Sequence, residues 1–493
     1  MGWETLRTMR DLRPDIVSFC ITVLLFTGCS ERTRITTQSD KALGYYTTGV
    51  LQWEKFYYPE AAFAFDEAIR YDSNFAMAWA RRALLDDALL NHAKAISDIS
   101  RAMSLSNRVT AFERMFIQLQ DCRLMYANNQ AERLADSLLH LYPDEKEIWL
   151  IRGNLYEVGK NFEEAIRSYQ RAVRIDTSYA LAVMSLGYAF STTGDQDRAV
   201  AQMERYIRLA PDAADPRASF ADILLRVGRY EEALEQYRQS LALKPDYWYS
   251  ANQIGGIYML KGMLRAAEDQ FHKGMASLPP SDALRATHLA LDGNLNVLRG
   301  LCKEAVQQYR RALELDSSNS EAAYGLVIAL KKMNDFPLAH ERLEAIREDL
   351  TRKNLLQSQY MLRYFLTSSR VFLDEGKPDA ARSVCDSALD YSTTLSRAPV
   401  FRQIAEIDLY ERRYEDALDA CEEALRMNPN HPDPLFTLAK VYHAKGDSLM
   451  TKEISDRLLD FWKNADPDFQ GLQELRQVLK TTHPASAPPI SSL

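Results

Sequence analysis

Thiols and imidazoles are the side chains of this chain that could act as nucleophiles, bases or metal ligands. The sequence has 6 cysteines and 8 histidines. Outside the N-terminal segment the cysteines are Cys122, Cys302, Cys385 and Cys421. Cys385 and Cys421 recur at a spacing where stronger parts of the chain have aromatic residues, so we expect them to be small buried hydrophobic residues.

The remaining polar residues form no recognisable catalytic motif. The histidines lack zinc-ligand spacing with a third donor nearby, and phosphate loops, serine elbows and metalloprotease helices are absent from the sequence. Acidic pairs such as Glu163-Glu164 are typical of solvated helix starts. Asp292 stands in a core column of the repeat described below, as does Arg82; for Asp292 we expect a satisfied buried carboxylate or a register shift. We therefore predict no catalytic residue, no metal site and no cofactor.

The charge of the chain argues against nucleic acid as a partner. The formal net charge is -8 at pH 7, with 26% charged residues. Basic patches such as Arg310-Arg311 are short and lie among acids at helical spacing, whereas nucleic-acid binding needs a clustered basic face. The 46% of hydrophobic residues and the low Gly and Pro content favour a helix-rich protein.

The N-terminus resembles a targeting segment. An apolar run over residues 16–26 follows several arginines and precedes Thr27-Gly28-Cys29. The run is too short to span a bilayer, and it is typical of a secretory signal. Phe26 to Cys29 is similar to the lipobox of bacterial lipoproteins, in which the cysteine is acylated; an ordinary signal peptide with a chance cysteine is the alternative.

The lipobox resemblance implies a signal peptide over residues 1–28, lipidation of Cys29 and a flexible tether over residues 29–41. Ser30 follows the cysteine, so the resemblance implies an outer-membrane lipoprotein facing the periplasm. The membrane would then be a partner only through the lipid anchor. No later segment has enough consecutive apolar residues to span a bilayer.

The chain from Lys146 to Ser281 repeats itself with a period of 34 residues. Units begin at Lys146, Ala180, Ala214 and Trp248. Position 8 of a unit is small, position 20 is alanine and position 24 is large. The core residues at positions 8 and 20 are Gly153, Ala165, Gly187, Ala199, Ala233, Gly255, Ala267 and, in the next unit, Ala305.

These columns predict two antiparallel helices in each unit. We expect the small residues at positions 8 and 20 to face each other, so that the two backbones approach closely. The residues at position 24 would fill the space around that contact. Gly194, Gly228 and Gly262 stand at position 15, where the first helix must end and the chain reverse. Proline at position 32 would start the turn into the next unit.

This pattern resembles the tetratricopeptide repeat. The resemblance implies an all-α fold, a right-handed superhelical solenoid of about twelve helix-turn-helix repeats. Eight more units fit the register, beginning near Ala42, Ala76, Phe112, Ala286, Ser320, Leu362, Ala398 and Pro432. We predict repeats 1–7 over residues 42–281, repeats 8–12 over 282–466, a capping helix over 467–482 and a disordered tail over 483–493. Residues 354–361 are an insertion and a candidate hinge.

The same resemblance implies a concave groove lined by the first helices. Positions 2, 5, 9 and 12 would point into it. The predicted partner-binding residues are Tyr46, Trp53, Asn154, Met184, Tyr188, Tyr249, Asn252, Met259, Asn294, Tyr324, Arg370 and Arg402. Aromatic rings supply contact area and asparagine can bond a peptide backbone, although such rings could also pack between neighbouring units.

The sequence therefore predicts a non-catalytic, membrane-tethered scaffold that binds partner proteins or peptides in assembly of envelope or secretion machinery. Two alternatives stay open. One is an accessory factor in polysaccharide export or glycan binding, and the other is an enzyme with an unrecognised site. Neither the partner nor the oligomeric state follows from the sequence.

Overall fold

The computed structural model describes residues 35–480, with gaps at 90, 279–280, 354–359, 394–395 and 427. The predicted signal peptide, Cys29 and the C-terminal tail lie outside the described residues. So does most of the predicted hinge. Within the described part, no helix has the length and apolar character that crossing a membrane requires.

The described chain is all helical, with 25 α-helices, one short 3-10 helix at Ser106–Arg108 and no strand among the residues described. The α-helices are α2 (Asp40–Glu54), α3 (Tyr58–Tyr71), α4 (Ala76–Ala88), α5 (His92–Leu105), α6 (Ala111–Leu124), α7 (Asn128–Leu141), α8 (Lys146–Val158), α9 (Phe162–Ile175), α10 (Ala180–Thr193), α11 (Gln196–Leu209), α12 (Asp215–Arg226), α13 (Tyr230–Leu243), α14 (Trp248–Leu260), α15 (Leu264–Ala276), α16 (Asp282–Leu298), α17 (Cys302–Leu315), α18 (Ser320–Lys332), α19 (Phe336–Arg352), α20 (Tyr360–Asp374), α21 (Pro378–Asp390), α22 (Arg397–Tyr410), α23 (Tyr414–Leu425), α24 (Pro432–Lys445), α25 (Ser448–Phe461) and α26 (Gln470–Lys480).

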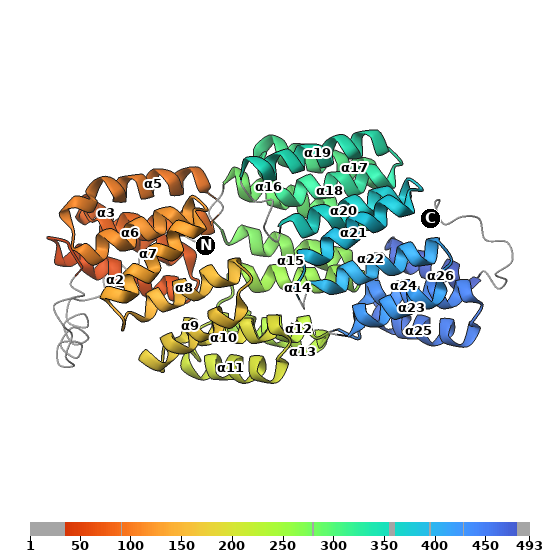
Figure 1. The fold of residues 1–493 in the computed structure, drawn as a ribbon, viewed down its shortest axis with the longest axis horizontal. Coiled ribbons are helices and arrows are strands. Elements are labelled where there is room, and N and C mark those ends of the chain that lie inside the picture. The colour runs from red at the N-terminus through yellow and green to blue at the C-terminus, as the bar shows by residue number, and fades with distance from the viewer. Residues whose placement is uncertain are drawn as a thin grey trace. The chain divides into compact units, whose positions relative to one another are not determined.

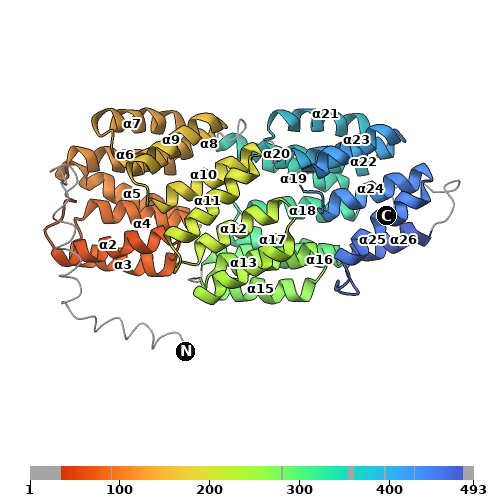
Figure 2. The ribbon, with the colours of Figure 1, turned by 90° about the horizontal axis from the view of Figure 1, so that it is seen from below.

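The helices from α2 to α25 form twelve successive pairs, each an A helix followed by a B helix. The two helices of a pair lie side by side in both ribbon views (Figures 1 and 2). The pairs coincide with the twelve predicted repeats, so the prediction of an all-α array of helix-turn-helix repeats is confirmed.

Helix α9 illustrates how the sequence produces such an element. The Asn161 side chain caps its N-terminus by accepting a hydrogen bond from the Glu164 amide at 3.3 Å. Glu163 and Glu164 stand in the first turn and Arg174 in the last, which complements the helix dipole. The buried residues recur at helical spacing, so one face of α9 packs against its repeat. They are Ala165, Ser168, Tyr169, Ala172 and Val173.

The turn between the A and B helices fixes the register of the whole array. Position 15 of each repeat has a positive φ, between 53° and 91°, wherever it is described. Six of these residues are glycines, including the predicted Gly194, Gly228 and Gly262. Five are not glycines: Phe56, Tyr126, Lys160, Asn334 and Arg412. The remaining position 15, residue 90, lies outside the description. The left-handed conformation is therefore a property of the repeat and not of glycine alone.

The contact between the A and B helices includes a second feature at position 8. The alanines at position 20, such as Ala165 and Ala305, are fully buried. A Cβ built on Gly153 would lie 2.2 Å from the ring of Tyr169, and one on Gly255 would lie 2.6 Å from the ring of Phe271. In these two repeats, position 8 therefore packs directly on the ring at position 24, and the ring edge occupies the place that a side chain at position 8 would take.

Two compact units divide the chain. The first comprises Met1–Leu51, Glu60–Ala88 and His92–Leu134, and the second comprises Gln52–Pro59, Leu89–Asn91 and Ala135–Leu493. The subdivision into residues 42–281 and 282–466 stays a prediction about repeats, because both segments contribute to the second unit.

The end of the predicted tether is held in the first unit. The Thr36 amide and hydroxyl donate to the Glu113 carboxylate at 2.7 and 2.6 Å. The Thr37 hydroxyl donates to Asp72 at 2.6 Å, and α2 already begins at Asp40. The part of the predicted flexible tether that follows residue 34 is thus ordered, because acids of later helices accept its hydroxyl and amide hydrogen bonds.

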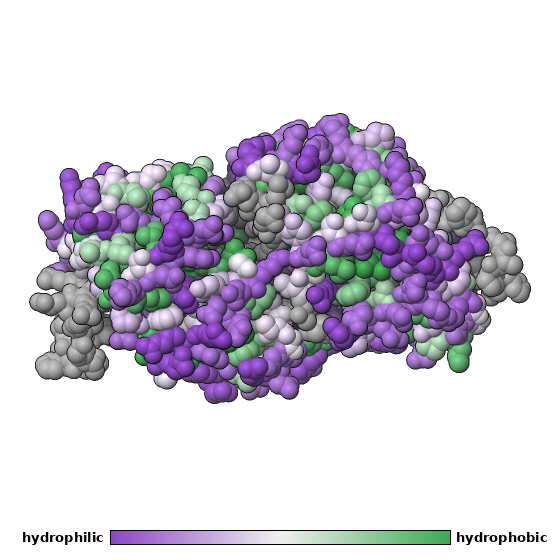
Figure 3. Space-filling model, viewed as in Figure 1, coloured by the Kyte–Doolittle hydropathy of each residue, from purple (hydrophilic) through white to green (hydrophobic). Residues whose placement is uncertain are grey.

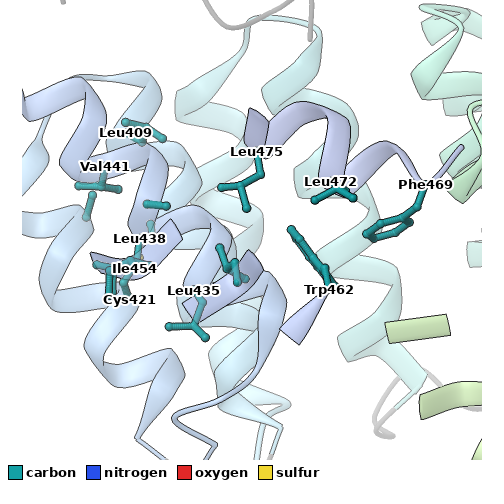
Figure 4. Packing of buried hydrophobic residues seen from close by; sticks show 14 of the residues in the cluster. Leu409, Cys421, Leu435, Leu438, Val441, Ile454, Trp462, Phe469, Leu472 and Leu475 are labelled. Atoms are coloured by element: carbon teal, nitrogen blue, oxygen red, sulfur yellow. The ribbon is translucent and has the colours of Figure 1, made fainter. Parts of the chain in front are cut away.

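A C-terminal helix covers the last repeat. Leu472 and Leu475 of α26 are buried with Phe469 and Trp462 in one apolar cluster (Figure 4). The Trp462 and Phe469 rings lie 5.3 Å apart between centroids. The Asp466 amide donates to the Gly262 carbonyl at 2.9 Å, so this end of the chain also packs on the turn of repeat 7. The cap prevents the last repeat from exposing an unpaired apolar face.

Candidate functional site

Five tyrosines surround two buried aspartates on repeats 5 to 7, and we call this group the tyrosine cluster. Its members are Asp215, Asp222, Tyr188, Tyr206, Tyr237, Tyr247 and Tyr249. Asp222 accepts hydrogen bonds from the hydroxyls of Tyr188 at 2.5 Å and Tyr249 at 2.8 Å, and from Tyr237. One carboxylate therefore joins the consecutive A helices α10, α12 and α14.

Asp215 forms the second half of the tyrosine cluster. It accepts hydrogen bonds from Tyr247 at 2.7 Å, Tyr206 at 2.9 Å and Ser219 at 3.1 Å. Burial raises the pKa of Asp215 to about 6, although these three donors lower it. Neutral hydroxyls thus compensate only part of the cost of burying this charge.

The predicted groove residues Asn154 and Asn294 have a role inside their own repeats. The Tyr169 hydroxyl donates to Asn154 at 2.8 Å, and the Tyr309 hydroxyl donates to Asn294 at 2.6 Å. Both pairs join position 24 of the B helix to position 9 of the A helix. Asp222 and Tyr237 occupy the same two positions in repeat 6. Each repeat with tyrosine at position 24 therefore has Asn or Asp at position 9, a correlation that comparison of the repeats within this sequence could have found.

Repeats 10 to 12 carry charged residues at the corresponding places, which we call the cation cluster: Arg370, Arg402, Lys440 and Glu406. Arg402 lies 2.7 Å from Glu406 and Lys440 lies 3.8 Å from it. Burial raises the pKa of Glu406, but Arg402, Lys440 and Arg370 outweigh burial and lower it to about 2. The Arg370 Nε has no hydrogen-bond partner among the described residues. Burial, with the repulsion of Arg402, lowers the pKa of Arg370 to about 10.

The other predicted groove residues differ in how deeply they are buried. Tyr46 and Tyr324 are buried, with 6% and 5% of their surface exposed. Both side chains pack between helices. The prediction missed this because the position of a residue along one helix does not show how closely the next helix approaches. Met184, Asn252 and Met259 are half-buried on α10 and α14. Met184 and Met259 border apolar clusters. Trp53 is half-buried and lies 5.7 Å from Tyr58 between ring centroids.

The sequence analysis missed Tyr206, Tyr237 and Tyr247, which stand outside the predicted columns. It also missed four charged members, Asp215, Asp222, Glu406 and Lys440. These four occupy positions 2 or 9, the same columns that supplied the predicted residues. They form no local motif, because several of their partners lie on neighbouring repeats.

The free cysteines are not poised as nucleophiles. Burial raises the pKa of Cys385 to about 11 and that of Cys421 to about 12, so both thiols stay protonated at neutral pH. Cys385 and Cys421 are buried, as expected, and Cys122 is buried too. Among the described residues, one group could hold a metal ion: His272, His288 and Asp292. The sequence analysis predicted no metal ligands there, because the ligands come from two helices and have no motif spacing.

Family models of the tetratricopeptide repeat match four segments of the chain, residues 128–180, 180–213, 219–282 and 408–448. These segments fall within the helix pairs described above. The matched segments are therefore tetratricopeptide repeats, as the column pattern implied, and they lie in an all-helical array of such helix pairs.

Curated relatives match only in part. The BBSome complex member BBS4 of Bos taurus is 25% identical over 202 residues, 40% of this chain and 37% of that protein. Anaphase-promoting complex subunit 6 of Arabidopsis thaliana is 26% identical over 212 residues, 42% of this chain and 39% of that protein. The protein O-mannosyl-transferase TMTC3 of Homo sapiens is 21% identical over 347 residues, 66% of this chain and 36% of that protein. The chain spans less than two fifths of the length of each.

Solved structures superpose on parts of the chain. A tetratricopeptide repeat protein from Parabacteroides merdae is 17% identical, with a TM-score of 0.38, over 54% of this chain and 99% of that one. MamA is 25% identical, with a TM-score of 0.28, over 32% of this chain and 93% of that one.

Proposed function

We propose that this protein is a non-catalytic scaffold that binds a partner protein on the A-helix side of repeats 4 to 12. The observation that carries the proposal is the way side chains of consecutive A helices converge. Asp222 joins α10, α12 and α14, and Glu406 of α22 pairs with Arg402 of its own helix and lies 3.8 Å from Lys440 of α24. Such cross-links hold neighbouring A helices in a fixed relation, so that side chains several repeats apart can contact one extended partner.

The chemistry of this side suits a mixed polar and apolar partner segment. Half-buried Met184 borders the apolar cluster that contains Tyr206, and half-buried Met259 borders the apolar cluster of repeat 7 and the C-terminal helices. Figure 3 shows apolar patches among hydrophilic side chains in the region of α18 to α22. Two relatives bear the names of subunits of multiprotein complexes, which supports a role in assembly.

Site-specific photo-crosslinking tests this proposal in the native host. A photoreactive residue replaces Met184 or Met259 on the A helices, or Glu235, which is exposed on the B helix α13. We expect the same partner to be captured from positions 184 and 259 but not from 235. Capture from position 235 alone, or equally from all three positions, would contradict binding on the A-helix side.

We also propose that Cys29 is lipidated and tethers the chain to the outer membrane of a bacterium, where the scaffold serves assembly of envelope or secretion machinery. The motif Phe26-Thr27-Gly28-Cys29 supports this proposal. In a bacterial host, Cys29→Ser should abolish incorporation of labelled fatty acid and release the chain from the membrane fraction. Unchanged membrane association of Cys29→Ser would overturn the tether but leave the scaffold proposal standing.

A further inference from the structure

Three potential metal ligands meet where repeat 7 packs on repeat 8. His272 lies on α15, and His288 and Asp292 lie one turn apart on α16. Their ligand atoms all lie within 4.8 Å of one another. The two imidazole rings are stacked, with centroids 4.6 Å apart. His272 is exposed and the other two are half-buried, so an ion from solvent can reach all three.

The spacing distinguishes this group from ordinary histidine–carboxylate pairs of the same chain. His340 and Glu375 are 2.8 Å apart, and His92 and Asp87 are 2.9 Å apart, so each pair forms a direct hydrogen bond. In contrast, the His288 Nε2 and the Asp292 Oδ2 are 3.7 Å apart, which is too long for a hydrogen bond. Two ligands of a tetrahedral zinc ion lie roughly 3.4 Å apart, since each bond measures about 2.0–2.1 Å. The observed separation is thus close to that of two ligands sharing an ion.

Further carboxylates lie near the three ligands, and three ligands leave one coordination position of a tetrahedral ion open. Glu268 lies one turn before His272 on α15. Arg299 binds Glu268 at 2.8 Å and lies 3.6 Å from Asp468, so this arginine is held by two carboxylates. Two imidazoles and one carboxylate are a ligand set that suits Zn²⁺, Ni²⁺, Cu²⁺ or Co²⁺ better than Mg²⁺ or Ca²⁺, which prefer oxygen ligands.

We propose that His272, His288 and Asp292 bind one divalent transition-metal ion of the zinc type, with water at the fourth position. The ion would connect the B helix of repeat 7 to the A helix of repeat 8. The 34-residue period slips between these two repeats. A metal ion here would stiffen the junction where the regular stacking is interrupted.

Titration of the full chain with Co²⁺ and Zn²⁺ tests the site, using protein without a polyhistidine tag. We expect one Co²⁺ per chain, with the strong visible absorption of a four-coordinate ion, displaced by Zn²⁺. His272→Gln and His288→Gln should each weaken binding by more than about tenfold, because even the loss of an outer-shell partner costs about 10–100-fold. Both variants should keep the helical circular dichroism and the metal-free melting temperature of the wild type, since neither side chain is buried.

His340→Gln is the matched control, because it removes an imidazole paired with one carboxylate on another helix pair. It should leave the Co²⁺ affinity and stoichiometry unchanged. Absence of the four-coordinate spectrum in the wild type would overturn the proposal. So would binding that survives both His272→Gln and His288→Gln, or that His340→Gln weakens equally.

Discussion

Asp222 and Glu406 occupy the same position 9, in repeats 6 and 11, yet they bind their neighbours by different chemistry. Asp222 contacts side chains of the A helices on both sides, and Glu406 contacts a side chain of the following A helix. Asp222 accepts hydrogen bonds from the neutral hydroxyls of Tyr188, Tyr237 and Tyr249. Glu406 instead lies among the cations Arg402, Lys440 and Arg370. One position of the repeat therefore supports two ways of joining adjacent units.

The difference follows the residue at position 24. Where position 24 is tyrosine, as at Tyr237, position 9 accepts its hydroxyl hydrogen bond. Where it is Cys385 or Cys421, no such hydroxyl exists, and position 9 is Arg370 or Glu406. A short residue on the B helix thus releases position 9 to form ion pairs along the A helices.

The buried carboxylates of the two clusters also differ in the direction of their pKa shifts. Burial raises the pKa of Asp215, in the tyrosine cluster, to about 6 despite three hydrogen bonds. The pKa of Glu406 is lowered to about 2 because Arg402 and the other cations outweigh its burial. Neutral hydrogen-bond donors offset only part of the rise in pKa that burial causes in a carboxylate, whereas nearby cations can turn that rise into a lowered pKa. The two clusters should therefore respond to pH in opposite directions.

Glu406→Gln should have the largest effect on stability. It leaves Arg402 without its compensating charge. Glu406 and Arg402 are 23% and 13% exposed, so the loss should lie near the lower end of the roughly 3–5 kcal/mol that removing one partner of a buried ion pair costs. Chemical denaturation at pH 7 measures this loss. Glu415→Gln is the control, because Glu415 is 76% exposed and pairs with Lys445 at 2.7 Å; exposed pairs contribute about 0–1 kcal/mol. Similar losses in both variants would show that the cation cluster is not a buried network.

The pH dependence of the same site has a definite sign. The folded pKa of Glu406, about 2, lies below the ordinary glutamate value of 4.5. Its stabilisation is therefore present above about pH 4.5 and is lost as the pH falls toward 2. The stability difference between the wild type and Glu406→Gln should shrink over that range.

Asp215→Asn should reveal the opposite dependence, with an amplitude of roughly 3 kcal/mol at about 1.4 kcal/mol per pKa unit. The folded pKa of Asp215, about 6, lies above the ordinary aspartate value of 3.8. The folded state therefore holds a proton that the unfolded state releases, and this stabilisation is lost as the pH rises from about 4 to about 6. Denaturation curves at intervals of pH should show the wild type losing stability relative to Asp215→Asn in that window. Parallel curves for the two proteins would contradict the assignment.

The sequence was sufficient for the array but not for the chemistry between its units. Alanine at position 20 marks eleven of the twelve helix pairs, with Thr451 in the last, because the two helices of one repeat approach each other closely there. Contacts inside a repeat recur in every repeat, so one chain provides many copies of the same evidence. The helix pairs of repeats 1 to 3 and 8 to 12 follow from the register found in repeats 4 to 7.

A particular side-chain contact between two repeats occurs only once in the chain. Aligning the repeats with one another therefore does not show it as a recurring pattern. Tyr188 was expected to face a partner, but its hydroxyl binds Asp222 of the next repeat. His272 and His288 have no meaning as a motif until α15 packs against α16. The sequence therefore predicted which columns face the A-helix side, but it could not predict which of their side chains bind one another.

Gly255 and Gly256 are adjacent residues of α14 that differ in how closely other atoms pack around them. Alanine substitutions at the two positions therefore measure the contribution of this packing to stability. A Cβ on Gly255 would lie 2.6 Å from the Phe271 ring, whereas a Cβ on Gly256 has nothing within 4 Å. Gly255→Ala should lower the free energy of unfolding by about 1–3 kcal/mol through overpacking. Gly256→Ala should raise it by about 1 kcal/mol, because alanine favours a helix more than glycine does. Equal effects of the two substitutions would mean that position 8 does not require glycine.

Substitutions at positions 9 and 24 should have the smallest effect on the free energy of unfolding. They also test most directly whether the two positions are energetically coupled. Tyr309→Phe removes the hydroxyl that donates to Asn294 at 2.6 Å, so it should cost about 1 kcal/mol. Repeat 7 has Phe271 and Gly256 at these positions and no such hydrogen bond. Phe271→Tyr alone should therefore destabilise the protein, because its hydroxyl gains no acceptor at position 9, and adding Gly256→Asn should recover about 1 kcal/mol. Denaturation of the two single variants and the double variant gives the coupling energy. A value near zero would mean that the correlation between tyrosine and Asn or Asp has no energetic basis in this array.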